Sequence, residues 1–153
     1  MSSSIVPLNL PKANLNLSQK GADLFVVCLI RKKKIVLTPE EWVRQHILSY
    51  LLHDLKIAAS LIAVEAALEY NQLKKRSDVV VFDGDGKPTL LVECKAPAVK
   101  LSENVYQQIA SYNAKMNVRR LLISNGIDHL VFNIDSVKGT ISMSSDLQDL
   151  VHS

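Results

Sequence analysis

An acidic residue placed two positions before a lysine is the pattern in this sequence that most directly suggests chemistry. It occurs three times, as Asp54-Leu-Lys56, Asp85-Gly-Lys87 and Glu93-Cys-Lys95. Side chains at i and i+2 of a strand point to the same face, so the pattern pairs a carboxylate with an ammonium where the chain is extended. Asp54 is expected at a helix end and Asp85 in a tight turn, where both residues have ordinary structural roles. Only the third triplet follows an apolar strand.

Glu93 therefore lies where a strand leaves the apolar interior, and Asp78 on the preceding strand can bring a second carboxylate close to it. Two carboxylates and the backbone carbonyl of Cys94 are the hard oxygen ligands that Mg²⁺ prefers, with Mn²⁺ as a substitute. Lys95 would then orient or deprotonate a water and offset charge on phosphoryl oxygens. The predicted chemistry is phosphodiester hydrolysis. The alternative is an exposed ion pair between Glu93 and Lys95, worth about 0.5 kcal/mol and without chemistry.

Composition places these residues in one globular domain. The 153 residues include 48% hydrophobic and 22% charged side chains, which excludes wholesale disorder. A net charge of +3 permits a polyanionic partner without requiring one. Residues 1–20 are predicted to be an extended arm, because they are rich in Ser and Asn and contain prolines, and residues 21–153 a single domain.

Cysteine usage and hydropathy predict a cytoplasmic protein. Cys28 and Cys94 form no C-x-x-C pair, which argues against both a zinc ribbon and a secreted disulfide framework. No apolar stretch approaches the roughly 20 residues that span a bilayer, so no membrane partner is expected.

The apolar periodicity predicts alternating strands and helices. Thr38, Pro39 and Glu41 are typical of a helix start, with Thr38 as the cap and Glu41 completing a capping box. Residues 61–69 are ambiguous, because their alanines favour a helix while their period of two favours a strand, and we predict a strand. The expected order is a hairpin of 24–30 and 35–37, a helix over 39–53, strands 61–69, 78–82 and 89–94, a helix over 103–116, strands 120–124 and 129–134, and a short helix near 145–151.

Several motifs in this order resemble the PD-(D/E)XK nuclease superfamily, in particular the N-terminal nuclease domain of type I restriction enzyme R subunits. The matches cover roughly residues 30–130. They are Thr38-Pro-Glu-Glu-Trp-Val-Arg44, Val64-Glu65, Arg76-Ser-Asp78-Val-Val-Val, Leu91-Val-Glu93-Cys-Lys95-Ala-Pro, Gln108-Ile-Ala-Ser-Tyr112 and Leu122-Ile-Ser-Asn-Gly126. The resemblance implies an α/β fold with a restriction-endonuclease-like core, in which helices flank a central mixed β-sheet.

The resemblance also assigns roles to residues. It implies that Asp78 and Glu93 bind metal, that Lys95 is catalytic, and that Gln108 and Tyr112 form the Q-x-x-x-Y element beside the active site, one helical turn apart. Ser77 replaces the proline of the motif's name, at a position that varies in the superfamily. An R subunit continues into a helicase motor, but this sequence contains no G-x-x-x-x-G-K-[ST] loop, so ATP-driven translocation is not expected.

Other charged residues have both a functional and an ordinary interpretation. Glu65 is either a further acidic group near the metal or a polar residue on a half-exposed strand. Lys74, Lys75 and Arg76 adjoin Asp78 and are candidates for holding DNA phosphates by non-specific electrostatics. The run Arg31–Lys34 can do the same, although a solvated basic turn is the commoner case.

Two functions remain open from sequence. The first is a Mg²⁺-dependent DNA endonuclease that acts through Asp78, Glu93 and Lys95, with separately encoded restriction or DNA-processing subunits, or a second copy in a homodimer, as partners. The second is a module that keeps the nuclease fold without turnover and docks on DNA or on proteins. The intact triad favours the first.

Overall fold

The protein is an α/β structure whose main sheet has six strands. The computed structural model describes residues 5–70, 73–102, 118–135 and 137–150, without the side chains of 66–70 and 73–77. The strands are β1 (Leu17–Lys20), β2 (Asp23–Val27), β3 (Lys34–Val36), β4 (Ile62–Tyr70), β5 (Leu73–Phe82), β6 (Pro88–Cys94), β7 (Arg120–Ser124), β8 (His129–Asp135) and β9 (Thr140–Ser144). The described helices are α1 (Pro39–Ser49), a π-helical turn that extends it (Tyr50–Asp54), and two 3₁₀ turns (Ala59–Leu61, Leu147–Leu150).

The main sheet is mixed and follows chain order from β4 to β9. Its strands are antiparallel except for β6 and β7, which run parallel with Leu90 opposite Arg120 and Cys94 opposite Ser124. A tight turn joins β5 and β6, because the Asp83 carboxylate accepts hydrogen bonds from the backbone N–H groups of Asp85 and Lys87. This turn fixes the register of the two strands that carry the predicted site.

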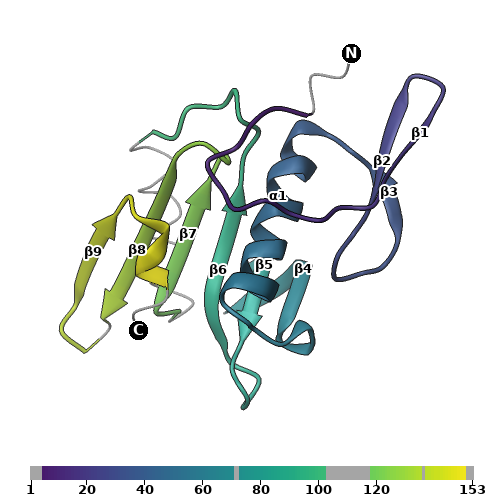
Figure 1. The fold of residues 1–153 in the computed structure, drawn as a ribbon. Coiled ribbons are helices and arrows are strands. Elements are labelled where there is room, and N and C mark those ends of the chain that lie inside the picture. The colour runs from purple at the N-terminus through teal and green to yellow at the C-terminus, as the bar shows by residue number, and fades with distance from the viewer. Residues whose placement is uncertain (1–4, 71–72, 103–117, 136, 151–153) are drawn as a thin grey trace.

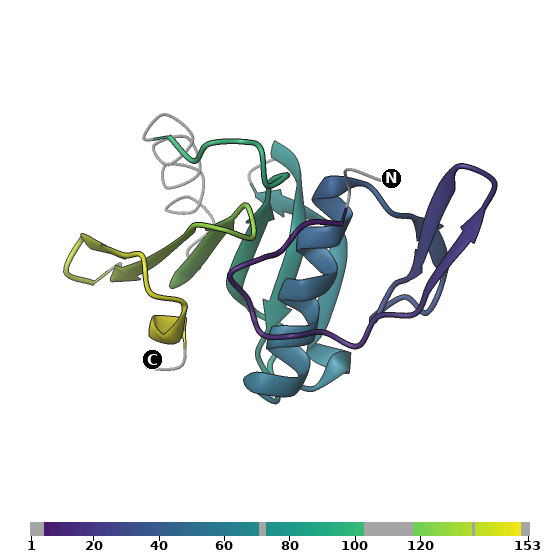
Figure 2. The same cartoon turned by 45° about the horizontal axis from the view of Figure 1, so that its top comes forward.

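Helix α1 covers one face of the main sheet (Figures 1 and 2). Thr38 caps it, as the sequence predicts, because its Oγ1 accepts a hydrogen bond from the Glu41 backbone N–H at 3.0 Å. Val43, Ile47 and Leu48 are fully buried against β5, β6 and β7. Each such side chain contributes about 1.5–3 kcal/mol. A second apolar cluster, built on Val80, Leu91, Leu121, Ile123 and Phe132, fills the opposite face.

The remaining strands form a small sheet beside α1, in the order β1–β2–β3 (Figure 2). Val26 lies at its centre, paired with Leu17 of β1 and Ile35 of β3. The backbone N–H of Leu29 donates to Oε1 of Gln45 on α1 at 3.0 Å, so the turn after β2 is attached to the helix.

The N-terminal segment crosses α1 before it enters the small sheet (Figure 1). The indole N–H of Trp42 donates to the Val6 carbonyl at 2.9 Å, and the Asn9 backbone N–H donates to the Gly126 carbonyl at 2.8 Å. The Leu8 side chain packs against Gly126 in the turn between β7 and β8. These contacts connect the start of the chain to the far end of the fold.

Substituting Gly126 tests this attachment. Its φ of +85° is strained for other residues, and an added Cβ would lie 2.7 Å from Leu8 and 3.1 Å from Val43. We expect Gly126→Ala to lower the free energy of unfolding by about 2–3 kcal/mol in urea. Gly139→Ala is the matched control, because Gly139 has a similar φ of +67° and nothing within 4 Å. Equal losses would contradict a role for the Leu8 contact.

The described elements agree with most of the predicted ones. The ambiguous segment 61–69 is a strand, and both predicted hairpins are present. The chain also contains β9, which the sequence did not predict, and residues 17–20 of the expected arm pair with β2. The predicted helix over 103–116 lies outside the described residues.

Candidate functional site

Asp78 and Glu93 lie next to each other on neighbouring strands. The β5–β6 ladder pairs Val79 with Val92, so the next residues outward are Asp78 on β5 and Glu93 on β6. Regular pairing of β5 with β6 ends at Val79 and Val92. Beyond this pair, β5 bonds to β6 through the Asp78 side chain, whose Oδ2 accepts a hydrogen bond from the Cys94 N–H at 2.7 Å.

Lys95 follows directly at the end of β6. Its backbone N–H donates to the Ser124 carbonyl at 2.8 Å, which continues the pairing with β7 while β5 diverges. Its side chain is half-buried. Burial and the charge of Asp78 raise the pKa of the Glu40 carboxyl on α1, and the Lys95 ammonium partly opposes that increase.

Arg44 of α1 is the centre of the acidic cluster, and sequence analysis gave it no role. Its Nη2 lies 3.2 Å from Oδ1 of Asp78 and 3.3 Å from Glu40. Its Nη1 lies 2.7 Å from Glu41 and 3.4 Å from Glu65. One guanidinium therefore contacts four carboxylates from three elements. The only available sequence signal was its i,i+3 and i,i+4 spacing from Glu41 and Glu40.

Arg44 is buried, which strengthens the contacts by which it orients the surrounding carboxylates. The side chain is only 8% exposed, and its Nε has no hydrogen-bond partner within the described structure. Burial by itself lowers the pKa of the guanidinium, but the carboxylates of Glu41 and Asp78 outweigh it and raise that pKa. Arg44 therefore stays charged and neutralises part of the acidic cluster, while holding Asp78 in one orientation.

Glu41 serves the site as well as the helix start. Its backbone N–H is capped by Thr38, whereas its carboxylate accepts hydrogen bonds from Arg44 and, at 2.9 Å, from Gln45. The sequence predicted that this carboxylate completes a capping box with Thr38, whereas the structure directs it to Arg44 and Gln45. The side chain belongs to the Arg44 network.

Glu65 occupies the strand position across from Asp78 on β4. The flanking pairs, Val64 with Val79 and Ala66 with Ser77, place it there, but its φ of +52° interrupts the ladder. A left-handed backbone at a non-glycine residue costs about 1–3 kcal/mol and often occurs at functional sites. The carboxylate bridges Arg44 and Arg31, each at 3.4 Å.

Burial and the neighbouring charges shift the pKa values of two groups at the site. The pKa of Glu40 is raised, chiefly by burial and next by the charge of Asp78, while Arg44 and Lys95 oppose the increase. Burial and Asp78 also raise the pKa of the Cys94 thiol well above its usual value. Cys94 is therefore a protonated core residue of β6, which agrees with its interpretation from sequence.

The donor set suits a hard divalent cation. Asp78 and Glu93 are carboxylates on adjacent strands, and the backbone of Cys94 runs beside the Asp78 carboxylate. Mg²⁺ commonly takes one or two protein carboxylates and completes its shell with waters and phosphate oxygens. Within the described ranges, no three His, Cys, Asp or Glu side chains converge as a metal cage. Asp78 and Glu93 are the residues that would supply such carboxylate oxygens.

The other predicted site residues are placed only in part. Gln108 and Tyr112 lie outside the described residues. Lys74, Lys75 and Arg76 lie on β5, where their backbones pair with Glu69, Leu68 and Ala67 of β4. The two remaining acidic-x-lysine triplets have the structural positions expected, with Asp54 ending the π-helical turn and Asp85 in the β5–β6 turn.

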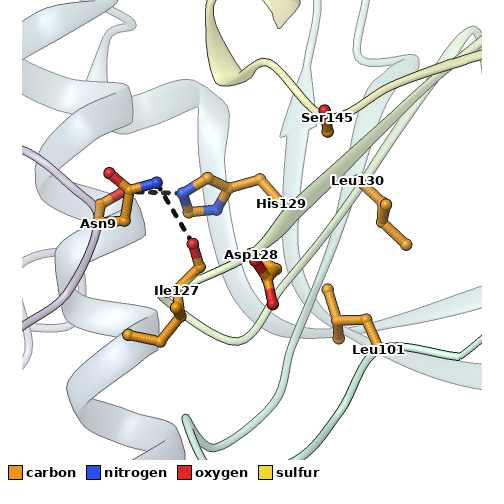
Figure 3. Close-up of a pocket in the computed structure, with 7 residues that line it drawn as sticks. All are labelled: Asn9, Leu101, Ile127, Asp128, His129, Leu130 and Ser145. Atoms are coloured by element: carbon orange, nitrogen blue, oxygen red, sulfur yellow. Dashed lines mark hydrogen bonds between the residues drawn. The ribbon is translucent and has the colours of Figure 1, made fainter.

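A cavity of about 390 Å³ lies apart from these residues, between the N-terminal segment and the β7–β8 turn (Figure 3). His129 is its most reactive lining group, but both ring nitrogens are engaged, with Ser124 Oγ and the Asn9 carbonyl, each at 2.8 Å. The Asn9 amide donates to the Ile127 carbonyl. These contacts hold the N-terminal segment and explain the histidine without catalysis.

Comparison with known proteins places residues 39–147 in a family. They match the family described as type I restriction enzyme R protein N terminus, which spans α1 and the main sheet but not the small sheet. A solved fragment described as an HsdR subunit of a type I restriction enzyme from Vibrio vulnificus YJ016 is 18% identical, with a TM-score of 0.42. The similarity covers 56% of this chain and 18% of that one. No curated protein matches the sequence.

Proposed function

The chain belongs to the family of type I restriction enzyme R protein N termini, and from this membership we propose that it is a metal-dependent DNA endonuclease of the PD-(D/E)XK type. The observation that carries the proposal is the position of Asp78 and Glu93 on adjacent strands where β5 leaves β6, with Lys95 at the end of β6. The reaction is hydrolysis of a phosphodiester bond.

Each residue has a defined task in this proposal. Asp78, Glu93 and the Cys94 carbonyl hold Mg²⁺ or Mn²⁺, and Glu65 is a further acidic group beside them. The ion supplies Lewis-acid stabilisation of charge on the phosphoryl oxygens. Lys95 orients the attacking water and offsets the same charge. Arg44 fixes the Asp78 carboxylate through the 3.2 Å contact.

Further groups extend the site by analogy with the family. Gln108 and Tyr112 act beside the reacting phosphate, and Lys74, Lys75 and Arg76 hold neighbouring phosphates of the DNA. Separately encoded restriction or DNA-processing subunits are the proposed partners, and a homodimer is a further arrangement. None of the helices in the described part of the chain is both long and apolar enough to cross a bilayer.

The direct test is cleavage of supercoiled plasmid and of short single strands by purified protein in Mg²⁺ or Mn²⁺. We expect nicking or linearisation that EDTA abolishes and that Lys95→Ala slows by about 10²-fold. Lys87→Ala is the matched control, because Lys87 belongs to the acidic-x-lysine triplet of the exposed β5–β6 turn.

The outcomes separate the two functions left open by sequence. Cleavage that persists in EDTA, or that Lys87→Ala and Lys95→Ala affect equally, contradicts the proposed site. A folded protein that neither cleaves DNA nor binds Mn²⁺ is instead a docking module. Binding of Mn²⁺ without cleavage points to a missing partner subunit.

A further inference from the structure

Four consecutive exposed cations lead from the turn after β2 into the first residue of β3, and we call them the basic turn: Arg31, Lys32, Lys33 and Lys34. We propose that the basic turn binds the phosphate backbone of the DNA strand that enters the Asp78–Glu93 site. The inference rests on the proposed function, since it names where that site holds its substrate. The turn lies outside the family match at residues 39–147, so its role cannot be taken from the family.

The basic turn has a fixed position next to the acidic cluster. Arg31 donates to the Val64 carbonyl at 2.9 Å and lies 3.4 Å from the Glu65 carboxylate. Glu65 is the β4 residue across from Asp78, and both contact Arg44. One exposed arginine thus joins the turn to the edge of the candidate site.

Hydrogen bonds hold the backbone of the turn. The Cys28 N–H donates to the Lys33 carbonyl at 2.8 Å, and the Lys32 N–H donates to the Cys28 carbonyl at 2.9 Å. The Leu29 N–H donates to Gln45, a fully buried residue that also binds Glu41. A solvated lysine run needs no such support, whereas a phosphate-binding turn gains affinity from being ordered before binding.

Charge explains why a nuclease site here requires these cations. Glu40, Glu41, Glu65 and Asp78 gather around Arg44, and duplex DNA carries one negative charge per roughly 1.7 Å of its axis. The acidic cluster repels that backbone, so neighbouring cations must compensate for the repulsion. Among the described residues, Lys32, Lys33 and Lys34 form no salt bridge, and the Lys34 ammonium rests 5.4 Å from the centre of the Phe25 ring. Three lysines are therefore available for phosphates.

The test measures DNA binding in a variant whose turnover is suppressed. Fluorescence anisotropy of a labelled DNA duplex is followed across a salt series in Mg²⁺, with Lys95→Ala as the background. One variant carries Lys32→Gln, Lys33→Gln and Lys34→Gln. The control carries Lys56→Gln, Lys87→Gln and Lys138→Gln, which remove the same charge from exposed positions outside the basic turn. Thermal melts verify that both variants are folded.

We expect the basic-turn variant to reduce the slope of log affinity against log salt by about 2–3, and affinity at low salt by about 10-fold or more. The control should change the slope by less than about 1. Equal losses in the two variants, or no binding by the background protein at low salt, would overturn the proposal. Turn-dependent binding by a wild-type protein that neither cleaves DNA nor binds Mn²⁺ refutes the proposed enzyme and leaves the DNA surface standing.

Discussion

Asp78→Asn is expected to abolish both divalent-metal binding and DNA cleavage while leaving the protein folded. The amide still offers an oxygen to the Cys94 N–H, which donates to the Asp78 carboxylate at 2.7 Å in the wild type, so the end of the β5–β6 ladder can persist. The substitution removes the negative charge to which both a divalent cation and Arg44 bind. We expect turnover to fall by about 10³-fold or more, because metal stabilisation of the transition state is worth several kcal/mol.

Two measurements separate the metal site from general damage. Calorimetric titration with Mn²⁺ should show binding by the wild type and none by Asp78→Asn. Mg²⁺ should raise the melting temperature of the wild type alone, since a ligand stabilises the state that binds it. Asp85→Asn, in the exposed β5–β6 turn, should behave as wild type in both assays. An undiminished Mn²⁺ titration by Asp78→Asn would remove Asp78 from the metal site.

Arg44→Met is expected to cause the largest loss of stability of any single substitution considered for this protein. The side chain is 8% exposed and contacts Glu40, Glu41, Glu65 and Asp78. Methionine fills similar space but leaves these carboxylates without their shared counter-charge. Breaking a buried ion pair from one side typically costs about 3–5 kcal/mol. Urea unfolding measures the loss.

Arg119→Met is the matched control, because Arg119 is exposed and its removal should change stability by no more than about 0.5 kcal/mol. The loss of stability in Arg44→Lys should fall between those of Arg44→Met and Arg119→Met. An ammonium keeps the charge but cannot span carboxylates from α1, β4 and β5 as a planar guanidinium does. If Arg44→Met is as stable as Arg119→Met, the carboxylates do not depend on Arg44.

The acidic cluster also explains how a small domain can organise an acidic site before a cation arrives. Arg44 compensates part of the negative charge from inside the fold, and Lys95 and Arg31 contribute from the site's edge. These cations reduce the electrostatic repulsion between the carboxylates, so the folded protein holds them close together. In our proposal the basic turn then compensates for the repulsion between the acidic cluster and a polyanionic substrate.

Sequence alone determined the local parts of this site. The Asp83-Gly-Asp-Gly86 turn and the apolar runs on both sides of it are sufficient to predict a hairpin, and a hairpin fixes which residues face each other. Asp78 beside Glu93, with Lys95 two residues later, follows from that register. The start of α1 could likewise be predicted from neighbouring residues, because Thr38 and Pro39 act within one helical turn. The strands that sequence analysis missed, β1 and β9, lie at sheet edges with mostly exposed side chains, and so carry little apolar pattern.

Only the tertiary structure decided what surrounds those residues. Arg44 and Asp78 are 34 positions apart, and Arg31 and Glu65 likewise, so no local period relates them. Their contacts depend on where α1 crosses the sheet and on how Gln45 attaches the basic turn to that helix. Both are set by packing of the buried faces, which every apolar residue of the core determines together. A hydrogen-bonded register can be predicted from spacing, but the meeting of two elements follows from the shape of the whole core.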